Sequence, residues 1–358
     1  MRNKILQLTK SLISMKTDSG NKDELKKALG LLLDKINEYT IEEFNSNGVD
    51  SVLIHNRKRG TREFKIILNG HIDVLPGKDI QYIPKVVGDK LYGAGSMDMK
   101  ASIACLLLTF KKVAKNVDYP IALQIVTDEQ PGGFNGTKYQ IDKGVRGDFI
   151  IAGEPTNLNV VNKAKGVLWL KISTKGKTAH SAYPWKGKNA IWDMMNFLST
   201  LRREYPIPNS QRWVSTINLS KISTGNMTFN KIPDNCESWV DIRFTPDNED
   251  ILKSIKSILP KGFNIGVVEN ESPMNVSKDN DYIKRLQKIG KAVLNEEIKL
   301  YGAQGTSDAR FYNQVGCSGI EFGPIGGGIG SDKEWINITS LEKYCVILNE
   351  FLLSFSEN

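Results

Sequence analysis

Three apolar segments in the first half of the chain are each followed directly by a short polar sequence that contains carboxylates. The junctions lie at residues 68–73, 126–130 and 152–156. Open, mostly parallel α/β sheets bind their ligands beyond the carboxyl ends of the strands. Helical patterns alternate with these strand-like segments, as such a sheet requires. The sequence therefore predicts an α/β fold, with a mostly parallel central sheet flanked by helices and its reactive side chains along one edge.

The pattern of the chain changes near Gly166 and returns near Val276. Between these points, two helical and several strand patterns predict a compact inserted α+β domain. We expect a discontinuous first domain, residues 1–165 and 272–358, and an inserted domain, residues 166–271. The expected helices are an amphipathic N-terminal helix, 21–36, 98–115, 189–203, 248–259, 281–294 and 339–355. The expected strands are 51–55, 64–68, 121–127, 148–152, 167–173, 214–220 and 237–244.

Composition excludes several classes of protein. The longest apolar runs fall well short of the ~20 residues that span a bilayer, and the N-terminus lacks a signal-peptide pattern, so we expect a cytoplasmic protein without a membrane partner. The net charge of +8 is spread along the chain among acidic residues, which argues against a nucleic-acid partner. The four cysteines include no CxxC pair, so neither a zinc knuckle nor a disulfide framework is expected.

The polar junctions contain side chains that can bind metal. His71 follows the first strand-like segment, and Asp73 two residues later can orient its ring. Asp98 lies in a glycine-rich turn before a helix, and Glu129 and Glu154 follow two further strand-like segments. One imidazole and two carboxylates form a sensible zinc site with a position open for water. Taken singly, His71 could be a loop histidine, Asp98 a helix N-cap and Glu154 a surface turn residue.

The order and flanks of these sequences resemble the zinc-dependent family that contains succinyl-diaminopimelate desuccinylase and acetylornithine deacetylase. The resemblance covers nearly the whole chain, and its last motif is most similar to the desuccinylase branch. The motifs that carry it are NGHID (69–73), GSMDMK (95–100), TDE (127–129), GEPT (153–156), GKTAHS (176–181), NKIP (230–233), DIR (241–243) and GTSDARF (305–311).

The resemblance implies a catalytic domain that binds a pair of zinc ions and an inserted lid domain that often dimerises. It implies that His71, Asp98 and Glu154 hold the first metal, with Asp98 bridging to the second. Glu129 would be the general base that takes a proton from the attacking water, and Asp73 would orient His71.

The resemblance also assigns residues to the substrate. His180 on the lid would reach the site of a neighbouring subunit and stabilise the oxyanion of the tetrahedral intermediate. The residues implied to bind substrate carboxylates are Arg243, Asn230, Thr306 and Arg310.

The chain departs from the family pattern at both ligands that belong to the second metal alone. Gln130 replaces an acidic residue, and Gly330 lies where a histidine is expected. The only histidines are His55, His71 and His180, so no later histidine can replace it. A neutral amide cannot offset the charge of a cation. We predict that the second metal is absent or weakly held, with Asp332 a conceivable substitute ligand.

These observations predict a metal-dependent hydrolase that cleaves the amide bond of small N-acylated amino acids or dipeptides. It would work with one Zn²⁺, for which Co²⁺ or Mn²⁺ could substitute, and would form a homodimer through the lid. Single-zinc peptidases show that one ion suffices for such chemistry. The alternative is a catalytically inactive relative that binds small molecules or regulates. A structural protein with one metal would leave Glu129 and the lid residues unexplained.

Overall fold

The computed structural model describes residues 1–356, which form two compact units. The first unit comprises Met1–Asn162, Asn275–Tyr301 and Ser307–Asn358, and the second comprises Lys163–Met274 and Gly302–Thr306. The second unit therefore takes in a short late segment that the sequence pattern assigned to the first domain. The late segment contacts the second unit directly, because the backbone N–H of Lys165 donates to the carbonyl of Ala303.

The helices and short helical turns are α1 (Arg2–Ile13), α2 (Lys22–Leu33), η1 (Asp79–Tyr82), η2 (Ser96–Lys100), α3 (Ala101–Val113), α4 (Thr137–Asp142), η3 (Pro184–Lys186), α5 (Ala190–Glu204), η4 (Pro246–Asn248), α6 (Ile251–Ser257), α7 (Asp281–Leu294), α8 (Ala309–Gln314) and α9 (Ile338–Leu353). The strands are β1 (Thr40–Ser46), β2 (Val49–His55), β3 (Glu63–His71), β4 (Lys85–Val87), β5 (Lys90–Tyr92), β6 (Ile121–Val126), β7 (Arg146–Ala152), β8 (Val160–Ala164), β9 (Gly166–Lys175), β10 (Thr216–Ser223), β11 (Asn235–Phe244), β12 (Phe263–Glu271), β13 (Met274–Asn275), β14 (Leu300–Ala303), β15 (Ser318–Phe322), β16 (Gly326–Gly327) and β17 (Trp335–Asn337).

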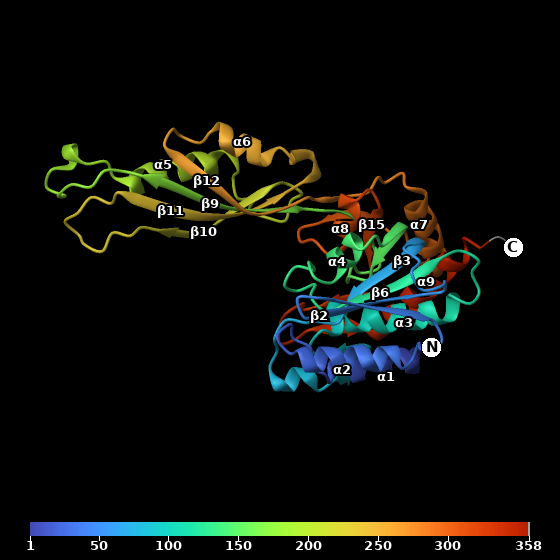
Figure 1. The fold of residues 1–358 in the computed structure, drawn as a ribbon. Helices are drawn as coiled ribbons and strands as arrows, with labels where there is room; N and C mark the ends of the chain where they lie inside the picture. Colours follow the sequence, from blue (N-terminus) through green and yellow to red (C-terminus); the bar gives the residue numbers. More distant parts are fainter. Residues whose placement is uncertain (357–358) are drawn as a thin grey trace. The chain divides into compact units, whose positions relative to one another are not determined.

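The main sheet has the order β1-β2-β6-β3-β7-β15-β8-β13, with β14 paired to β8 (Figure 1). Its central strands β6, β3, β7 and β15 run parallel to one another, whereas the pairings β1–β2, β2–β6 and β15–β8 are antiparallel. This confirms the predicted α/β fold with a mostly parallel central sheet. Because parallel strands end on the same edge, the residues that follow β3, β6 and β7 meet there.

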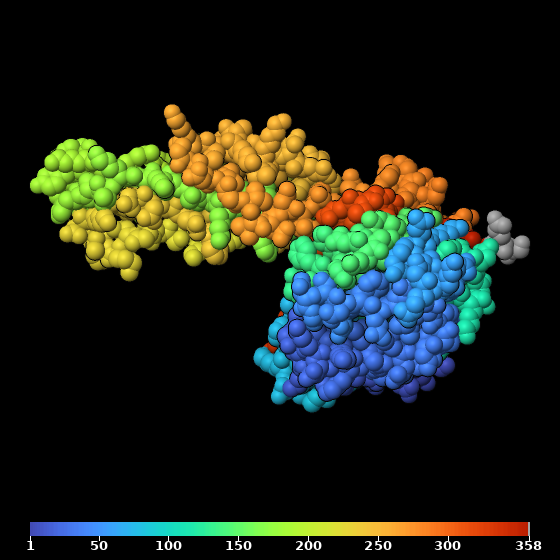
Figure 2. All heavy atoms as spheres, viewed as in Figure 1, coloured from blue at the N-terminus to red at the C-terminus, as the bar shows by residue number. Residues whose placement is uncertain are grey.

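Helices cover both faces of this sheet, which explains why its central strands contain runs of consecutive apolar residues. Ile66 and Leu68 of β3 are buried in the cluster that includes α1, α3, α7 and α9. Ile67, which points to the other face, is buried with Ile150 and with Phe311 of α8. The N-terminal residues, coloured blue, form much of the surface of the first unit seen in Figure 2.

The helix expected from Asp98 begins at Ala101, because residues 96–100 form a separate turn. Asp98 and Met99 have non-helical backbone angles within this turn. The reason is a distant carboxylate: Glu334 accepts hydrogen bonds from the backbone N–H groups of Gly95, Met97 and Asp98 at 3.0, 2.8 and 3.0 Å. These groups would otherwise be free donors at the start of a helix. The turn therefore places Asp98 ahead of the helix.

The second unit contains an antiparallel sheet with the order β10-β11-β9-β12. One face is packed against α5 and α6, where Leu168, Leu170 and Ile242 lie in a buried cluster with Phe197. The opposite face bears the exposed rings of Trp169 and Trp239, among other residues. The strand β12 was not expected from the sequence. The unit has the predicted α+β composition of one sheet and one helical layer.

No helix among the described residues is long and apolar enough to cross a membrane. The four cysteines are all free thiols.

The acid stability of the first unit should depend on Glu42. Burial opposes its ionisation, but hydrogen bonds from Arg62, Gly60 and His55 lower its pKa to about 2. A lowered pKa stabilises the folded state at pH values above the unfolded value, and that stabilisation is lost as the pH falls towards 2. We expect Glu42→Gln to cost roughly 3 kcal/mol at pH 7 and progressively less below pH ~4.5. Unfolding free energies measured at several pH values check this, and a pH-independent difference would contradict it.

Candidate metal and catalytic site

His71 is the last residue of β3, and its ring is buried at the carboxyl edge of the main sheet. Its Nδ1 lies 2.8 Å from the backbone carbonyl of Asp73 and 3.4 Å from the Asp73 carboxylate. Both neighbours are acceptors, so Nδ1 carries a proton and donates. The other nitrogen, Nε2, is thereby directed to the carboxylates that follow.

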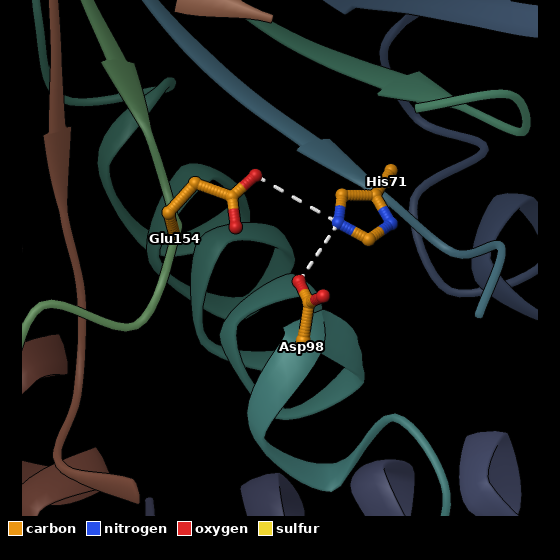
Figure 3. Close-up of side chains that lie close together, drawn as sticks. All are labelled: His71, Asp98 and Glu154. Atoms are coloured by element: carbon orange, nitrogen blue, oxygen red, sulfur yellow. Dashed lines mark hydrogen bonds and ion pairs between the residues drawn. The ribbon is translucent and has the colours of Figure 1, made fainter. Parts of the chain in front are cut away.

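Three carboxylates surround Nε2 of His71. Asp98 Oδ1 lies at 3.1 Å, Glu154 Oε1 at 3.7 Å and Glu129 Oε2 at 3.8 Å from it. Figure 3 shows His71, Asp98 and Glu154 directed at one point from β3, from the turn before α3 and from the residues after β7. One ligand atom from each of these three residues lies within 4.8 Å of the others.

The charges of this cluster favour a cation at Nε2. Burial opposes protonation of His71, but the charge of Asp98 and hydrogen bonds to Asp73 and Asp98 raise its pKa well above the ordinary value. Burial and the charge of Asp98 also raise the pKa of Glu154 well above its usual range. A neutral imidazole would direct its lone pair at these carboxylates, so the site needs either a proton or a metal ion there.

The donor set fits zinc. One nitrogen and two carboxylate oxygens are ligands that zinc commonly takes, each about 2 Å from the ion. Atoms arranged tetrahedrally at that radius lie roughly 3.4 Å apart, close to the 3.1 and 3.7 Å that separate Nε2 from Asp98 and Glu154. The three predicted ligands of a first metal are therefore brought together.

Glu129 lies beside this cluster, on the loop that follows β6. Burial raises its pKa to about 8, helped by the charges of Asp308, Asp98 and Asp73 and opposed by that of His71. Its backbone N–H donates to Asp73 Oδ1 at 3.2 Å, so Asp73 holds the loop as well as His71. A carboxylate with a pKa near neutrality can both accept and release a proton at ordinary pH.

The two positions expected to bind the second metal, Gln130 and Gly330, do not provide metal-binding side chains. The side-chain amide of Gln130 donates to Asp98 Oδ2 at 3.0 Å and to Glu129 Oε2 at 3.2 Å. Gly330 lines a small hollow together with Asp98, Leu75 and other residues, but offers no side chain. Among residues 1–356, no second group of metal-binding side chains was found besides His71, Asp98 and Glu154.

The segment after Gly330 does not supply a substitute. Asp332 is largely exposed and pairs with Lys78, so its carboxylate is engaged at the surface. Glu334 is occupied by the three backbone N–H groups of the turn at Asp98. Its role could not have been read from the sequence, because its partners lie more than 230 residues away.

Arg310 is buried in the first unit and contacts the loop that carries Glu129. Its guanidinium donates to the carbonyl of Gly132 at 2.6 Å and to that of Ser307 at 3.0 Å. Asp308 lies 3.8 Å away and also accepts a hydrogen bond from Thr137. These contacts hold the loop in place, and the substrate contact implied for Arg310 stays a prediction.

The remaining residues implied to bind substrate belong to the second unit. His180 is exposed and forms a β-bridge with Lys231, and the N–H of Ser181 donates to the carbonyl of Asn230, so His180 and Asn230 lie on adjoining segments. Arg243 pairs with Asp241 through two contacts of 3.0 and 3.3 Å.

Thr306 differs from the other residues implied to bind substrate. Its hydroxyl is buried and has no hydrogen-bond partner within the described chain. An unpaired buried hydroxyl is costly, which makes this group a good candidate for a ligand contact.

Residues 67–354 match the family described as peptidase family M20/M25/M40. Succinyl-diaminopimelate desuccinylase of Rickettsia felis is 29% identical over 324 residues, which cover 82% of this chain and 84% of that protein. The desuccinylase of Pelagibacter ubique is 26% identical over 325 residues, covering 83% and 84%.

Solved structures show the same fold. Aminopeptidase PepT from Bacillus cereus superimposes with a TM-score of 0.79 at 17% identity, covering 99% of this chain and 98% of that one. An M20 family metallo-carboxypeptidase from Sulfolobus solfataricus gives a TM-score of 0.75 at 15% identity, with 98% of each chain covered.

Proposed function

The chain belongs to peptidase family M20/M25/M40, and from this premise we propose that it hydrolyses the amide bond of small N-acylated amino acids or dipeptides with one bound zinc ion. Family membership makes it a hydrolase of amide bonds. The observation that supports the proposed mechanism is the buried cluster of His71, Asp98 and Glu154 with Glu129 beside it. The amide at Gln130 and the missing side chain at Gly330 support the proposal of a single ion.

His71, Asp98 and Glu154 would hold the ion, and Co²⁺ or Mn²⁺ could occupy the same ligands. A zinc ion in such a site polarises a carbonyl oxygen and lowers the pKa of water. Glu129 Oε2, which lies 3.8 Å from Nε2 of His71, accepts the proton of the attacking water and passes it to the leaving amine. Asp73 holds both His71 and the backbone of Glu129, so metal ligand and base keep a fixed relation.

The second unit supplies the substrate contacts of this proposal. His180 would stabilise the oxyanion that forms on the carbonyl, and Arg243 would bind a substrate carboxylate. Asn230 and the unpaired hydroxyl of Thr306 would complete the contacts. Arg310 would also bind a substrate carboxylate, and its guanidinium holds the loop of Glu129 through the carbonyls of Gly132 and Ser307.

The second unit also carries the surface proposed for a homodimer. β10 is an edge strand, and its side chains Leu219 and Ile222 are exposed beside Met195 of α5. These residues line one apolar pocket of the second unit. Exposed edge strands pair readily, and a two-fold arrangement would join the β10 strands of two copies.

The proposed dimer is tested by introducing a charged side chain on the edge strand β10. We expect wild-type protein to sediment as a dimer and Leu219→Lys as a monomer, because lysine on an edge strand opposes pairing. Val267→Lys on the opposite edge strand β12 is the matched control, since the two side chains are equally exposed at 47%. A monomeric wild type, or a dimeric Leu219→Lys, would contradict the proposal.

The function is tested by release of primary amine from N-succinyl and N-acetyl amino acids and from dipeptides. The zinc-loaded protein is expected to release amine from at least one of these classes, and metal-stripped protein from none. Absence of release by fully zinc-loaded protein across all classes would instead support the catalytically inactive relative. The retained base Glu129 beside the metal cluster favours the enzyme.

A further inference from the structure

Gln130 lies where the family resemblance implies a carboxylate ligand of the second metal. Its side chain instead donates hydrogen bonds to neighbouring carboxylates. One N–H donates to Asp98 Oδ2 at 3.0 Å, and the same nitrogen lies 3.2 Å from Glu129 Oε2. Its backbone N–H donates to Asp73 Oδ2 at 2.9 Å. Gln130 is therefore fixed at main chain and side chain, and it joins a metal ligand to the base.

The two oxygens of Asp98 have different partners. Oδ1 lies 3.1 Å from Nε2 of His71, and Oδ2 accepts from Gln130. In a two-metal site the second oxygen of a bridging carboxylate would bind the second ion. Here the side-chain amide of Gln130, whose hydrogen has a partial positive charge, contacts Oδ2 in place of the second ion. Oδ1 remains directed at the first site.

We propose that Gln130 is a positioning residue whose side-chain amide replaces the second metal ion, holding the ligand Asp98 and the base Glu129 in register around a single ion. This inference rests on the proposed one-zinc site and assigns a role to a residue that would otherwise be only a lost ligand. Groups that hold metal ligands by hydrogen bonds affect metal affinity or activity by about 10- to 100-fold.

The first test is Gln130→Met, which keeps the length of the side chain and removes the amide. We expect one zinc per chain as in the wild type, a zinc dissociation constant raised ~10-fold or more, and a kcat lowered ~10-fold with KM nearly unchanged. Competition with a chromophoric chelator measures the dissociation constant without any substrate. Gln7→Met, at an exposed position on α1, is the control and should match the wild type.

The second test restores the lost ligands with Gln130→Glu and Gly330→His together. Two zinc ions per chain are expected, because the added carboxylate and imidazole complete a site with Asp98. Gly330 has a positive φ of 65°, which strains the backbone of any replacement, whereas the new Cβ would meet only the flexible side chain of Leu75 at 3.0 Å, which is half exposed and can move. Unfolding measured in parallel shows that the variant is folded.

The outcomes separate the two proposals. Unchanged zinc affinity and kcat in Gln130→Met would overturn the role of Gln130, as would a double variant that is folded and still binds one ion. Two zinc ions in the wild type would overturn both the role and the one-zinc site. A failure to hydrolyse any substrate concerns only the proposed function, because zinc affinity and stoichiometry are measured without substrate.

Discussion

Replacing Glu129 by glutamine should lower kcat by about 10² to 10⁴-fold, the range that a general acid–base group contributes. Glutamine has the same shape but cannot accept the proton of the attacking water. The structure predicts that zinc content is retained, because the three residues that group as metal ligands are His71, Asp98 and Glu154. Rate and elemental analysis on the same preparation measure both quantities.

Stability should not fall in this variant. In the metal-free protein, burial raises the pKa of Glu129 to about 8, so the folded chain holds a proton there that the unfolded chain releases above pH ~4.5. A raised carboxyl pKa makes the ionised form costly at neutral pH, so a neutral amide relieves that cost. Glu43→Gln, on an exposed position of β1, is the control for any general effect of removing a charge. Turnover that survives in Glu129→Gln would remove this residue from the mechanism.

Replacing His71 by alanine should weaken zinc binding by more than ~100-fold and abolish turnover. Loss of a group that merely orients a ligand already costs 10- to 100-fold, so loss of a direct ligand should cost more. The imidazole is the only nitrogen in the grouped set, and its removal leaves acidic groups facing one another. Zinc titration against a chelator, followed by elemental analysis, measures the effect.

His180→Ala provides the comparison for this result. His180 is exposed in the second unit and is not among the grouped ligands, so its loss should reduce turnover while one zinc per chain remains. If His71→Ala retains tight zinc, then the ion is bound elsewhere and the assignment of the first site is wrong.

Much of the first unit could be predicted from the sequence because its strands are buried on both faces. The apolar runs before residues 69, 127 and 153 locate β3, β6 and β7, and parallel pairing brings their polar ends together. The grouping of His71 with Glu154 therefore follows from local pattern and topology alone. The helix expected from residue 21 is likewise present as α2, and the side chain of Asn21 caps it by accepting from the N–H of Glu24.

Other features depend on contacts between residues that lie far apart in the chain. The turn at Asp98 was predicted as the start of a helix, but the carboxylate of Glu334 holds it in another conformation. Gln130 was recognised as a poor ligand, whereas its hydrogen bonds to Asp98 and Glu129 required coordinates. The contact between Arg310 and the Gly132 carbonyl could not be predicted either, because nothing in the motif around Arg310 indicates that carbonyl.

Any fragment that represents the second unit has to include the late segment Gly302–Thr306. Gly302 packs closely under the ring of Trp213, and the side chain of Gln304 donates to the carbonyl of Arg212. A fragment that ends at Met274 would lack this segment and would leave the indole of Trp213 without its cover. Expression of the second unit alone therefore requires a linker that restores residues 302–306. The fluorescence of Trp213, measured with the other tryptophans of the unit replaced by phenylalanine, reports whether the segment has docked.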